Sequence, residues 1–206
     1  MSEWSAGLTG RILRKPDMAG FRCPISEVCG IDEAGRGPLA GPVSAGAVIL
    51  PEDFPLGLLD DSKALSLSRR ESAYEAIVSG ALDWAVGWAT WEEIGRINIL
   101  AASLLAMKRA FDALCLDPRI VLVDGNRVPS LGRTTYALIK GDSIHPSIMA
   151  ASILAKVARD RVMERLDHVE PCYGFAKNKG YPTKAHRAAI KKTGLSLWAR
   201  PGFRIG

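Results

Sequence analysis

The sequence predicts an α/β fold with a mixed central sheet, flanking helices and a small C-terminal helical extension. Two apolar, β-rich runs at residues 28–32 and 43–50 are joined by a glycine-dense turn, as in a hairpin. Strand patterns then alternate with helical patterns along the rest of the chain. The 206 residues, 48% of them hydrophobic and 24% charged, have the length and composition of one globular domain.

The middle of the chain supplies the next elements. A helix is expected at residues 66–79, because Ser66 suits its N-cap. Residues 82–90 alternate between apolar and polar side chains, which predicts a strand. The long apolar run at residues 97–116 predicts a helix that Pro118 ends.

The second half continues this alternation. Residues 119–124 form an unbroken apolar run, typical of a central strand that is covered on both faces. A further strand is expected at residues 134–139, and helices at residues 146–169 and 183–192. Apolar or small residues recur along one face of the first of these helices, at Ile148, Ala151, Ala155, Ala158 and Val162.

The chain divides into three segments by pattern. Residues 1–27 are predicted to be an irregular leader, residues 28–170 the main domain, and residues 171–206 a basic extension. Apolar stretches are too short to cross a bilayer, and the leader has no long apolar core, so neither a membrane protein nor a secretory signal is expected. The four cysteines have no metal-ligand spacing and are interpreted as reduced thiols of a cytoplasmic protein.

Charge is distributed unevenly along the chain. The net charge is +5, but residues 171–206 hold eight basic and no acidic side chains, against 19 basic and 22 acidic ones before them. Aromatic residues lie among these charges, at Tyr173, Phe175, Tyr181, Trp198 and Phe203. This pattern is typical of contact with nucleic acid. The alternative is a solvated basic surface whose rings belong to the core, and composition alone does not decide between the two.

Four carboxylates stand at the ends of predicted elements. Asp32 and Glu33 end the first strand, Asp124 ends the central strand, and Asp142 precedes a helix. Each has a structural alternative: a charged strand end, an Asp-Gly turn, or an acid that favours a helix N-terminus. Because neighbouring strand residues point to opposite faces, Asp32 and Glu33 can share one site only if the chain leaves strand geometry there.

Together the four acids indicate a metal site. Hard oxygen ligands without Cys or His select Mg²⁺ or Mn²⁺, and no Ser–His–Asp arrangement competes with this interpretation. Beside a basic, aromatic extension, the expected chemistry is phosphodiester cleavage with two metal ions.

Six sequence blocks follow one another along the chain: GIDEAGRGPLAGPV at 30–43, DSKALS at 61–66, LVDGN at 122–126, KGD at 140–142, AASILAKVARD at 150–160 and NKGYPTKAH at 178–186. In this order they resemble the motifs of bacterial ribonuclease HII. The resemblance covers about residues 28–203 and implies a ribonuclease H-like fold. It also implies an endonuclease that cuts the RNA strand of RNA–DNA hybrids and incises 5′ of single ribonucleotides in duplex DNA. That incision, which leaves 3′-hydroxyl and 5′-phosphate ends, would begin ribonucleotide excision repair.

The resemblance also assigns roles to residues. Asp32, Glu33, Asp124 and Asp142 match the metal-binding catalytic carboxylates, Gly35, Arg36 and Gly37 match the loop that senses the ribose 2′-hydroxyl, and Tyr181 matches the tyrosine on the neighbouring deoxyribose. Lys63 and Lys156 match motif lysines, for which substrate phosphate and a structural ion pair are equal alternatives. Lys177 and Lys179, in the basic extension, are expected to contact the substrate backbone.

Two other functions compete with this one. The first is another metal-dependent nuclease or strand-transfer enzyme of the same fold, which the GRG and NKGYPT motifs disfavour. The second is a non-catalytic nucleic-acid-binding module whose acids are structural. We expect a monomer whose partners are RNA–DNA hybrid and ribonucleotide-containing duplex, and the sequence offers no recognisable support for a sliding-clamp partner.

Overall fold

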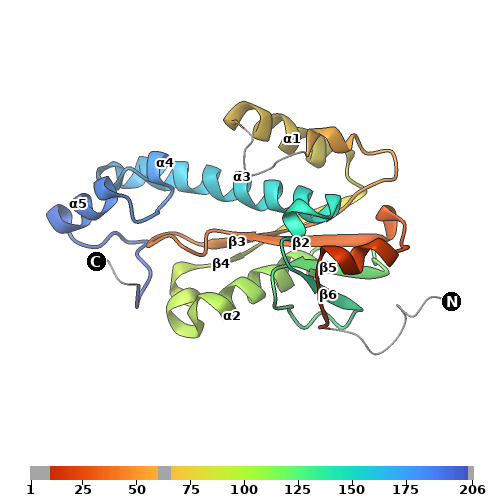
Figure 1. The fold of residues 1–206 in the computed structure, drawn as a ribbon. Helices are drawn as coiled ribbons and strands as arrows, with labels where there is room; N and C mark the ends of the chain where they lie inside the picture. The colour runs from red at the N-terminus through yellow and green to blue at the C-terminus, as the bar shows by residue number, and fades with distance from the viewer. Residues whose placement is uncertain (1–9, 60–65, 204–206) are drawn as a thin grey trace.

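A computed structural model describes residues 10–59 and 66–203, and its centre is a six-stranded sheet in the order β1-β6-β5-β2-β3-β4 (Figure 1). The strands are β1 (Ile12–Leu13), β2 (Val28–Ala34), β3 (Val43–Ile49), β4 (Asp83–Ala89), β5 (Ile120–Asp124) and β6 (Thr135–Leu138). The α-helices are α1 (Leu67–Gly80), α2 (Trp91–Asp112), α3 (Pro146–Val169), α4 (Phe175–Asn178) and α5 (Lys184–Thr193). The predicted mixed sheet with flanking helices is confirmed.

The sheet has an antiparallel half and a parallel half that share β2. Strands β2, β3 and β4 pair antiparallel, whereas β5 pairs parallel to β2, and β6 parallel to β5. Parallel neighbours end at the same edge of a sheet. The carboxyl ends of β2 and β5 therefore lie together, which is where ligands bind in open α/β sheets.

Helices cover both faces of the sheet. Helix α2 lies on one face, and α1 and α3 lie on the other (Figure 1). Three strand glycines set the closeness of this packing. A Cβ at Gly30 or Gly46 would collide with the backbone of α3, and one at Gly87 would collide with the backbone of α2. The helices thus lie directly against the strand backbone, at positions where any side chain would separate the layers.

The leader contributes to the sheet rather than remaining irregular throughout. Its strand β1 pairs parallel with β6, with Ile12 opposite Ala137, and Leu13 is fully buried. Three buried residues of β1, β5 and β6 pack together there, namely Leu13, Leu122 and Leu138. An isolated pair of apolar residues gives too short a period to be recognised as a strand from sequence.

Helix α2 spans Trp91–Asp112, whereas the predicted range is 97–116, so the helix both starts and ends earlier than expected. Thr90 and Glu93 form a capping box, in which each side chain accepts the backbone N–H of the other residue, so the helix begins at Trp91. Asn98 interrupts it with a φ of 67°. The apolar run begins at that interruption, which explains why hydrophobic periodicity alone misses the first turn.

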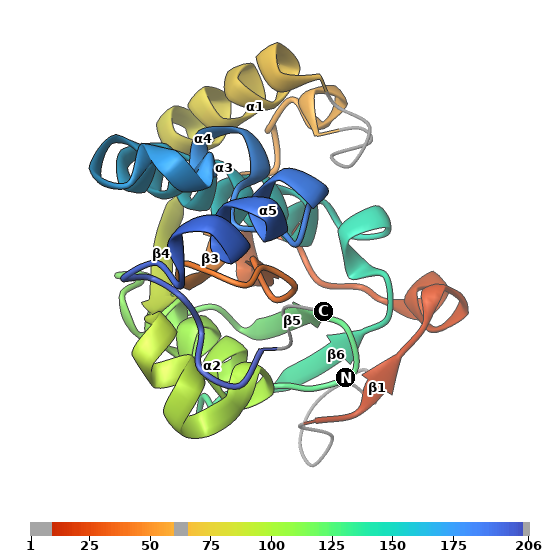
Figure 2. The ribbon, with the colours of Figure 1, turned by 90° about the vertical axis from the view of Figure 1, so that its left-hand side faces the viewer.

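The C-terminal extension forms one end of the molecule (Figure 1). There α4, α5 and the C-terminal segment lie beside the loop between β2 and β3, and this end faces the viewer in Figure 2. Ala40 of the loop forms a β-bridge with Ala199 of the extension. Among the described residues, no helix is long and apolar enough to span a membrane.

Candidate active site

Three of the four predicted acids come together at the carboxyl edge of the parallel strands. Ile31 pairs with Val123, so Asp32 and Asp124 follow at the next position of neighbouring strands. The backbone N–H of Asp142 donates to Oδ1 of Asp124 at 3.4 Å. Asp32 and Asp142 are only 5% and 6% exposed, respectively. Three segments far apart in the sequence thus bring carboxylates to one partly buried place.

Glu33 joins this group through local contacts. Its backbone N–H donates to Oδ1 of Asp32 at 2.7 Å, and its carboxylate pairs with Arg36 at 3.1 Å. Strand geometry continues through Ala34, so the chain departs from it only at Gly35, where φ is 96°. The bend that was expected for a shared site is therefore absent. The Asp32 carboxylate instead accepts the Glu33 amide, and the Glu33 charge still acts on Asp32, so the two acids are close without a bend between them.

Burial and the charges of neighbouring carboxylates make Asp32 and Glu33 harder to ionise. Burial is the main cause that raises the pKa of Asp32 well above its ordinary value, and the charges of Glu33 and Asp124 raise it further. Burial also raises the pKa of Glu33, against the opposing effect of Arg36. A cation beside these oxygens would relieve both effects, because it favours the charged form of each carboxyl.

The donor set suits a hard divalent cation. All four candidate ligands are carboxylates, the type that Mg²⁺ and Mn²⁺ prefer. In the part of the chain that the structure describes, no three His, Cys, Asp or Glu side chains stand as a ready metal-holding group. The acids approach in pairs instead: Asp32 accepts from the Glu33 amide, and Asp124 accepts from the Asp142 amide. Binding of a cation would require the carboxylates to turn toward a common centre.

A pocket of about 420 Å³ opens beside Glu33. One part of its lining is the glycine loop, residues 35–37. Tyr181 and the α3 residues Ser152 and Lys156 also line it. A Cβ at Gly37 would lie 3.6 Å from the ring of Tyr181, so this glycine faces the tyrosine across the pocket. Tyr181 is 40% exposed, which favours a substrate-facing role over a role as a core anchor.

The predicted lysines lie in different surroundings. The Lys156 ammonium pairs with Asp160 at 2.7 Å and lies 6.0 Å from the centre of the Tyr181 ring, so it serves an ion pair and also lines the pocket. The Lys179 ammonium is bound to Glu164 at 2.6 Å. Lys177 is exposed and has no ion pair with any described residue. The remaining prediction, Lys63, lies outside the described residues.

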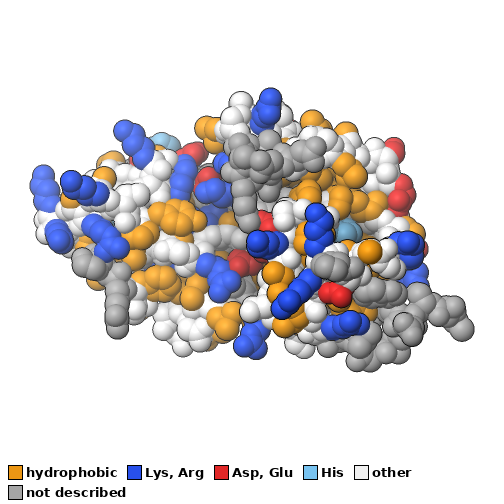
Figure 3. All heavy atoms as spheres, in the orientation of Figure 1, with side chains coloured by type: hydrophobic (Ala, Val, Ile, Leu, Met, Phe, Trp, Pro, Cys, Tyr) orange, Lys and Arg blue, Asp and Glu red, His pale blue; other side chains and the backbone are white. Residues whose placement is uncertain are grey.

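Only part of the basic extension forms a basic surface. Lys and Arg side chains gather at the end of the molecule that carries α5 (Figure 3), and those that are exposed include Lys177, Lys184, Lys191 and Lys192. Arg200 was counted among them from sequence, but it is 4% exposed and donates only to backbone carbonyls. Two of the rings, Tyr173 and Phe175, are buried and stacked with centroids 5.5 Å apart, and so belong to the core.

The buried positions of Arg159 and Arg200 beside the loop are not predicted by the sequence analysis. Both are buried, and both donate to carbonyl oxygens of the loop between β2 and β3. Arg159 lies within a matching sequence block, but arginine is seldom fully buried, so a helical arginine is expected on an exposed face. No sequence signal distinguishes it from such a residue.

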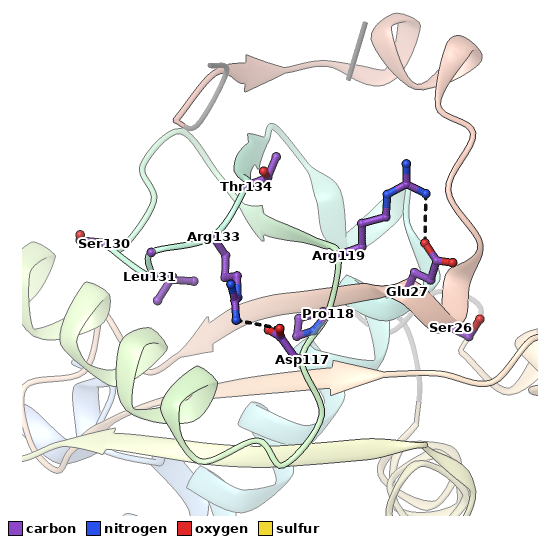
Figure 4. Close-up of a pocket in the computed structure, with 10 residues that line it drawn as sticks. Ser26, Glu27, Asp117, Pro118, Arg119, Ser130, Leu131, Arg133 and Thr134 are labelled. Carbon is purple, nitrogen blue, oxygen red and sulfur yellow. Dashed lines mark hydrogen bonds and ion pairs between the residues drawn. The ribbon is translucent and has the colours of Figure 1, made fainter. Parts of the chain in front are cut away.

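A larger pocket lies elsewhere. It has about 830 Å³ and is lined by residues around the start of β5, including Glu27 and Asp117 (Figure 4). Arg119 pairs there with Glu27 and Arg133 with Asp117, so its charges are already paired. None of the predicted site residues lines it. The larger of these two pockets is therefore not the one that the predicted site residues line.

The chain is similar to known ribonucleases over most of its length. The family model "Ribonuclease HII" matches residues 29–204. Relatives named ribonuclease HII are 51% identical in Burkholderia thailandensis, over 89% of this chain and 86% of that protein, and 48% identical in Shewanella sp. strain MR-7, over 94% of each. The crystal structure of ribonuclease H2 from Pyrococcus horikoshii matches with a TM-score of 0.70 and 27% identity, over 86% of this chain and 94% of that one. This protein belongs to the ribonuclease HII family, the type 2 ribonucleases H.

Proposed function

We propose that this enzyme incises duplex DNA 5′ of a single embedded ribonucleotide, in addition to cutting the RNA strand of RNA–DNA hybrids as its family does. The products would carry 3′-hydroxyl and 5′-phosphate ends, and the incision would begin ribonucleotide excision repair. One observation carries the proposal: a single pocket is lined by an acid, Glu33, by the Gly35–Gly37 loop and by Tyr181. Such a pocket combines a cleavage group with groups that can inspect a sugar.

We assign the cation site to Asp32, Glu33, Asp124 and Asp142. Their oxygen-only chemistry, together with the raised pKa of Asp32 and of Glu33, fits two ions of Mg²⁺ or Mn²⁺. Such a pair, when bound, would supply the positive charge that activates water and stabilises the leaving 3′ oxygen. Arg36 holds the Glu33 carboxylate through its ion pair, and both residues line the pocket.

The loop and Tyr181 divide the recognition of the sugars. The 2′-hydroxyl is the only group that distinguishes ribose from deoxyribose, and it is small. Backbone N–H groups can reach it only where no Cβ intervenes, as at Gly37. The exposed ring of Tyr181 can pack against the adjacent deoxyribose, where an added hydroxyl would crowd it.

The remaining surfaces support binding to a duplex. The exposed lysines at the α5 end would contact backbone phosphates without sequence preference. We further propose that the enzyme acts as a monomer in the cytoplasm, where its four cysteines, all free thiols, remain reduced.

Cleavage of a matched set of duplexes tests the proposal. One duplex carries a single ribonucleotide, a second is a continuous RNA–DNA hybrid, and a third is all DNA, each with Mg²⁺, Mn²⁺ or EDTA. We expect cation-dependent cuts at the 5′ side of the single ribonucleotide and none in the all-DNA duplex. Asp124→Asn should fold normally and lose cleavage on the order of 10²-fold or more. Near-normal activity of Asp32→Asn and Asp124→Asn in saturating Mn²⁺ would refute the cation site.

A further inference from the structure

Two buried guanidinium groups donate hydrogen bonds to the backbone carbonyls of the loop between β2 and β3. Arg159 of α3 is 1% exposed, and Arg200 of the extension is 4% exposed. Burial lowers the pKa of both, and neither lies within ion-pair distance of a carboxylate among the described residues. A buried charge without a counter-ion is costly, so other groups must compensate for it.

Backbone carbonyls supply that compensation. Arg200 donates five hydrogen bonds of 2.7–3.1 Å, and their acceptors are the carbonyls of Gly35, Arg36, Pro38, Gly41 and Pro42. Arg159 donates to the carbonyls of Pro42 at 2.9 Å, Ala40 at 3.2 Å and Lys179 at 3.0 Å. Seven of these eight bonds end on the one loop.

The amides of the loop are arranged differently from its carbonyls. The N–H groups of Leu39 and Gly41 donate to Gly180 and Trp198, at 2.8 and 2.9 Å. The N–H groups of residues 35–37, which line the pocket, have no hydrogen-bond acceptor among the described residues. The carbonyls of the loop are therefore bound by the two buried arginines. The amides of residues 35–37, next to the pocket, have no acceptor among the described residues.

Arg159 also connects the two sides of the pocket. Its Nη1 binds the carbonyl of Lys179, two residues before Tyr181, while Nε and Nη2 bind the loop. Gly180 adds a second connection, since its carbonyl accepts from Leu39. One rigid, planar group thus bonds to both the glycine loop and the turn that carries Tyr181.

We propose that Arg159 and Arg200 are positioning residues for ribose recognition: they bind the loop carbonyls inside, aim the amides of residues 35–37 into the pocket, and fix the distance from the loop to Tyr181. This inference rests on the proposed function of that pocket. Neither side chain needs to touch the substrate. Arg200 belongs to the extension, so the extension would serve specificity through this contact as well as affinity through its exposed lysines.

Arg200→Lys tests the proposal because it keeps the charge but not the five-donor fork. A single ammonium cannot reach carbonyls on so many sides, so the loop should shift. In a continuous hybrid several riboses can be aligned to a shifted loop, whereas a single ribonucleotide offers only one. We expect the ratio of kcat/KM for the single-ribonucleotide duplex to kcat/KM for the hybrid to fall about tenfold, the equivalent of one hydrogen bond.

This ratio does not depend on the concentration of active enzyme, so a loss of stability alone leaves it unchanged. Arg161→Lys is the control for an arginine-to-lysine change, because Arg161 lies on α3 like Arg159 but is exposed and pairs with Glu71 instead of the loop. Its ratio should equal that of the wild type. Folding of each variant is checked by circular dichroism and by its melting temperature.

The outcomes separate the two claims. If the wild type does not cut the single-ribonucleotide duplex, the proposed function fails, and the inference fails with it. If the wild type cuts it and folded Arg200→Lys keeps the wild-type ratio, only the positioning role is overturned. If Arg200→Lys does not fold, Arg159→Lys is used in the same assay. Failure of both to fold would show that the arginines serve the fold itself, which also overturns the inference.

Discussion

Gly35 and Gly37 are two residues apart, yet the same substitution should affect them differently. Gly35 has a φ of 96°, and a Cβ there would run into the side chain of Arg159. A side chain at positive φ costs about 1–2 kcal/mol, and displacing one charged hydrogen bond costs about 1.5–3 kcal/mol. Gly35→Ala should therefore destabilise the protein by about 2.5–5 kcal/mol, which lowers the melting temperature by roughly 5–20 °C in a chain of this size.

Gly37→Ala should leave stability almost unchanged. The added Cβ would meet the Tyr181 ring at 3.6 Å, an ordinary contact distance. The change in unfolding free energy should stay within about 0.5 kcal/mol. The methyl group would instead occupy the space between loop and ring, so cleavage of the single-ribonucleotide duplex should fall on the order of 10²-fold.

Thermal unfolding and cleavage assays on the two variants decide the matter. The reasoning predicts one variant with a large loss of stability, and another with near-normal stability and a large loss of activity. Equal melting temperatures would refute the role of Arg159 as the group behind Gly35. A fully active Gly37→Ala would refute the assignment of this pocket to the ribose.

Three further predictions concern Tyr181, His145 and the lysines of the extension. Tyr181→Phe should keep much of the activity, while Tyr181→Ala should lose more on the single-ribonucleotide duplex than on continuous hybrid; equal losses with a lowered melting temperature would indicate a structural role. His145 accepts the Ser147 N–H at 3.3 Å, and burial lowers its pKa to about 4. The fold therefore binds fewer protons than the unfolded chain and loses stability as pH falls from about 6.5 to about 4, so His145→Asn, which keeps an acceptor, should show a smaller loss in acid unfolding curves. Lys177→Ala should weaken binding to every duplex and reduce the salt dependence by about one unit of slope, whereas Lys179→Ala, which removes a Glu164 partner, should change the slope less; an unchanged slope for Lys177→Ala would contradict a phosphate contact.

Elements with strong periodicity could be predicted from sequence. The central strand expected at 119–124 is β5, which begins one residue later, at Ile120. The helix expected at 146–169 is α3, whose observed bounds are the same. The start of α2 could also have been found, since Thr90 and Glu93 have the spacing of a capping box. A prediction from the hydrophobic run alone places the start at residue 97, six residues after the observed one.

The site residues that could be predicted from sequence are those whose type is unusual at their position. Residues that are placed by packing alone could not be predicted. Acids at strand ends identified Asp32 and Asp124, because such positions seldom carry uncompensated charge. The burial of Arg159 was not predictable, since the face inferred from Ala158 and Val162 shifts to Arg159 and Met163 in the second half of α3. Which arginine turns inward depends on a loop more than 100 residues earlier.

The bond from Arg200 to Gly35 joins residues 165 positions apart, and this separation has a consequence for synthesis on the ribosome. All four acids and the glycine loop emerge long before Arg200 does. Until that residue is available, the carbonyls of the loop lack five of their donors. A nascent chain that stops at residue 190 would already contain the acids and Tyr181, but its loop would be held only by Arg159 and by the bond from the Leu39 amide to the Gly180 carbonyl. Maturation of specificity should therefore be a late event in translation, later than completion of the sheet.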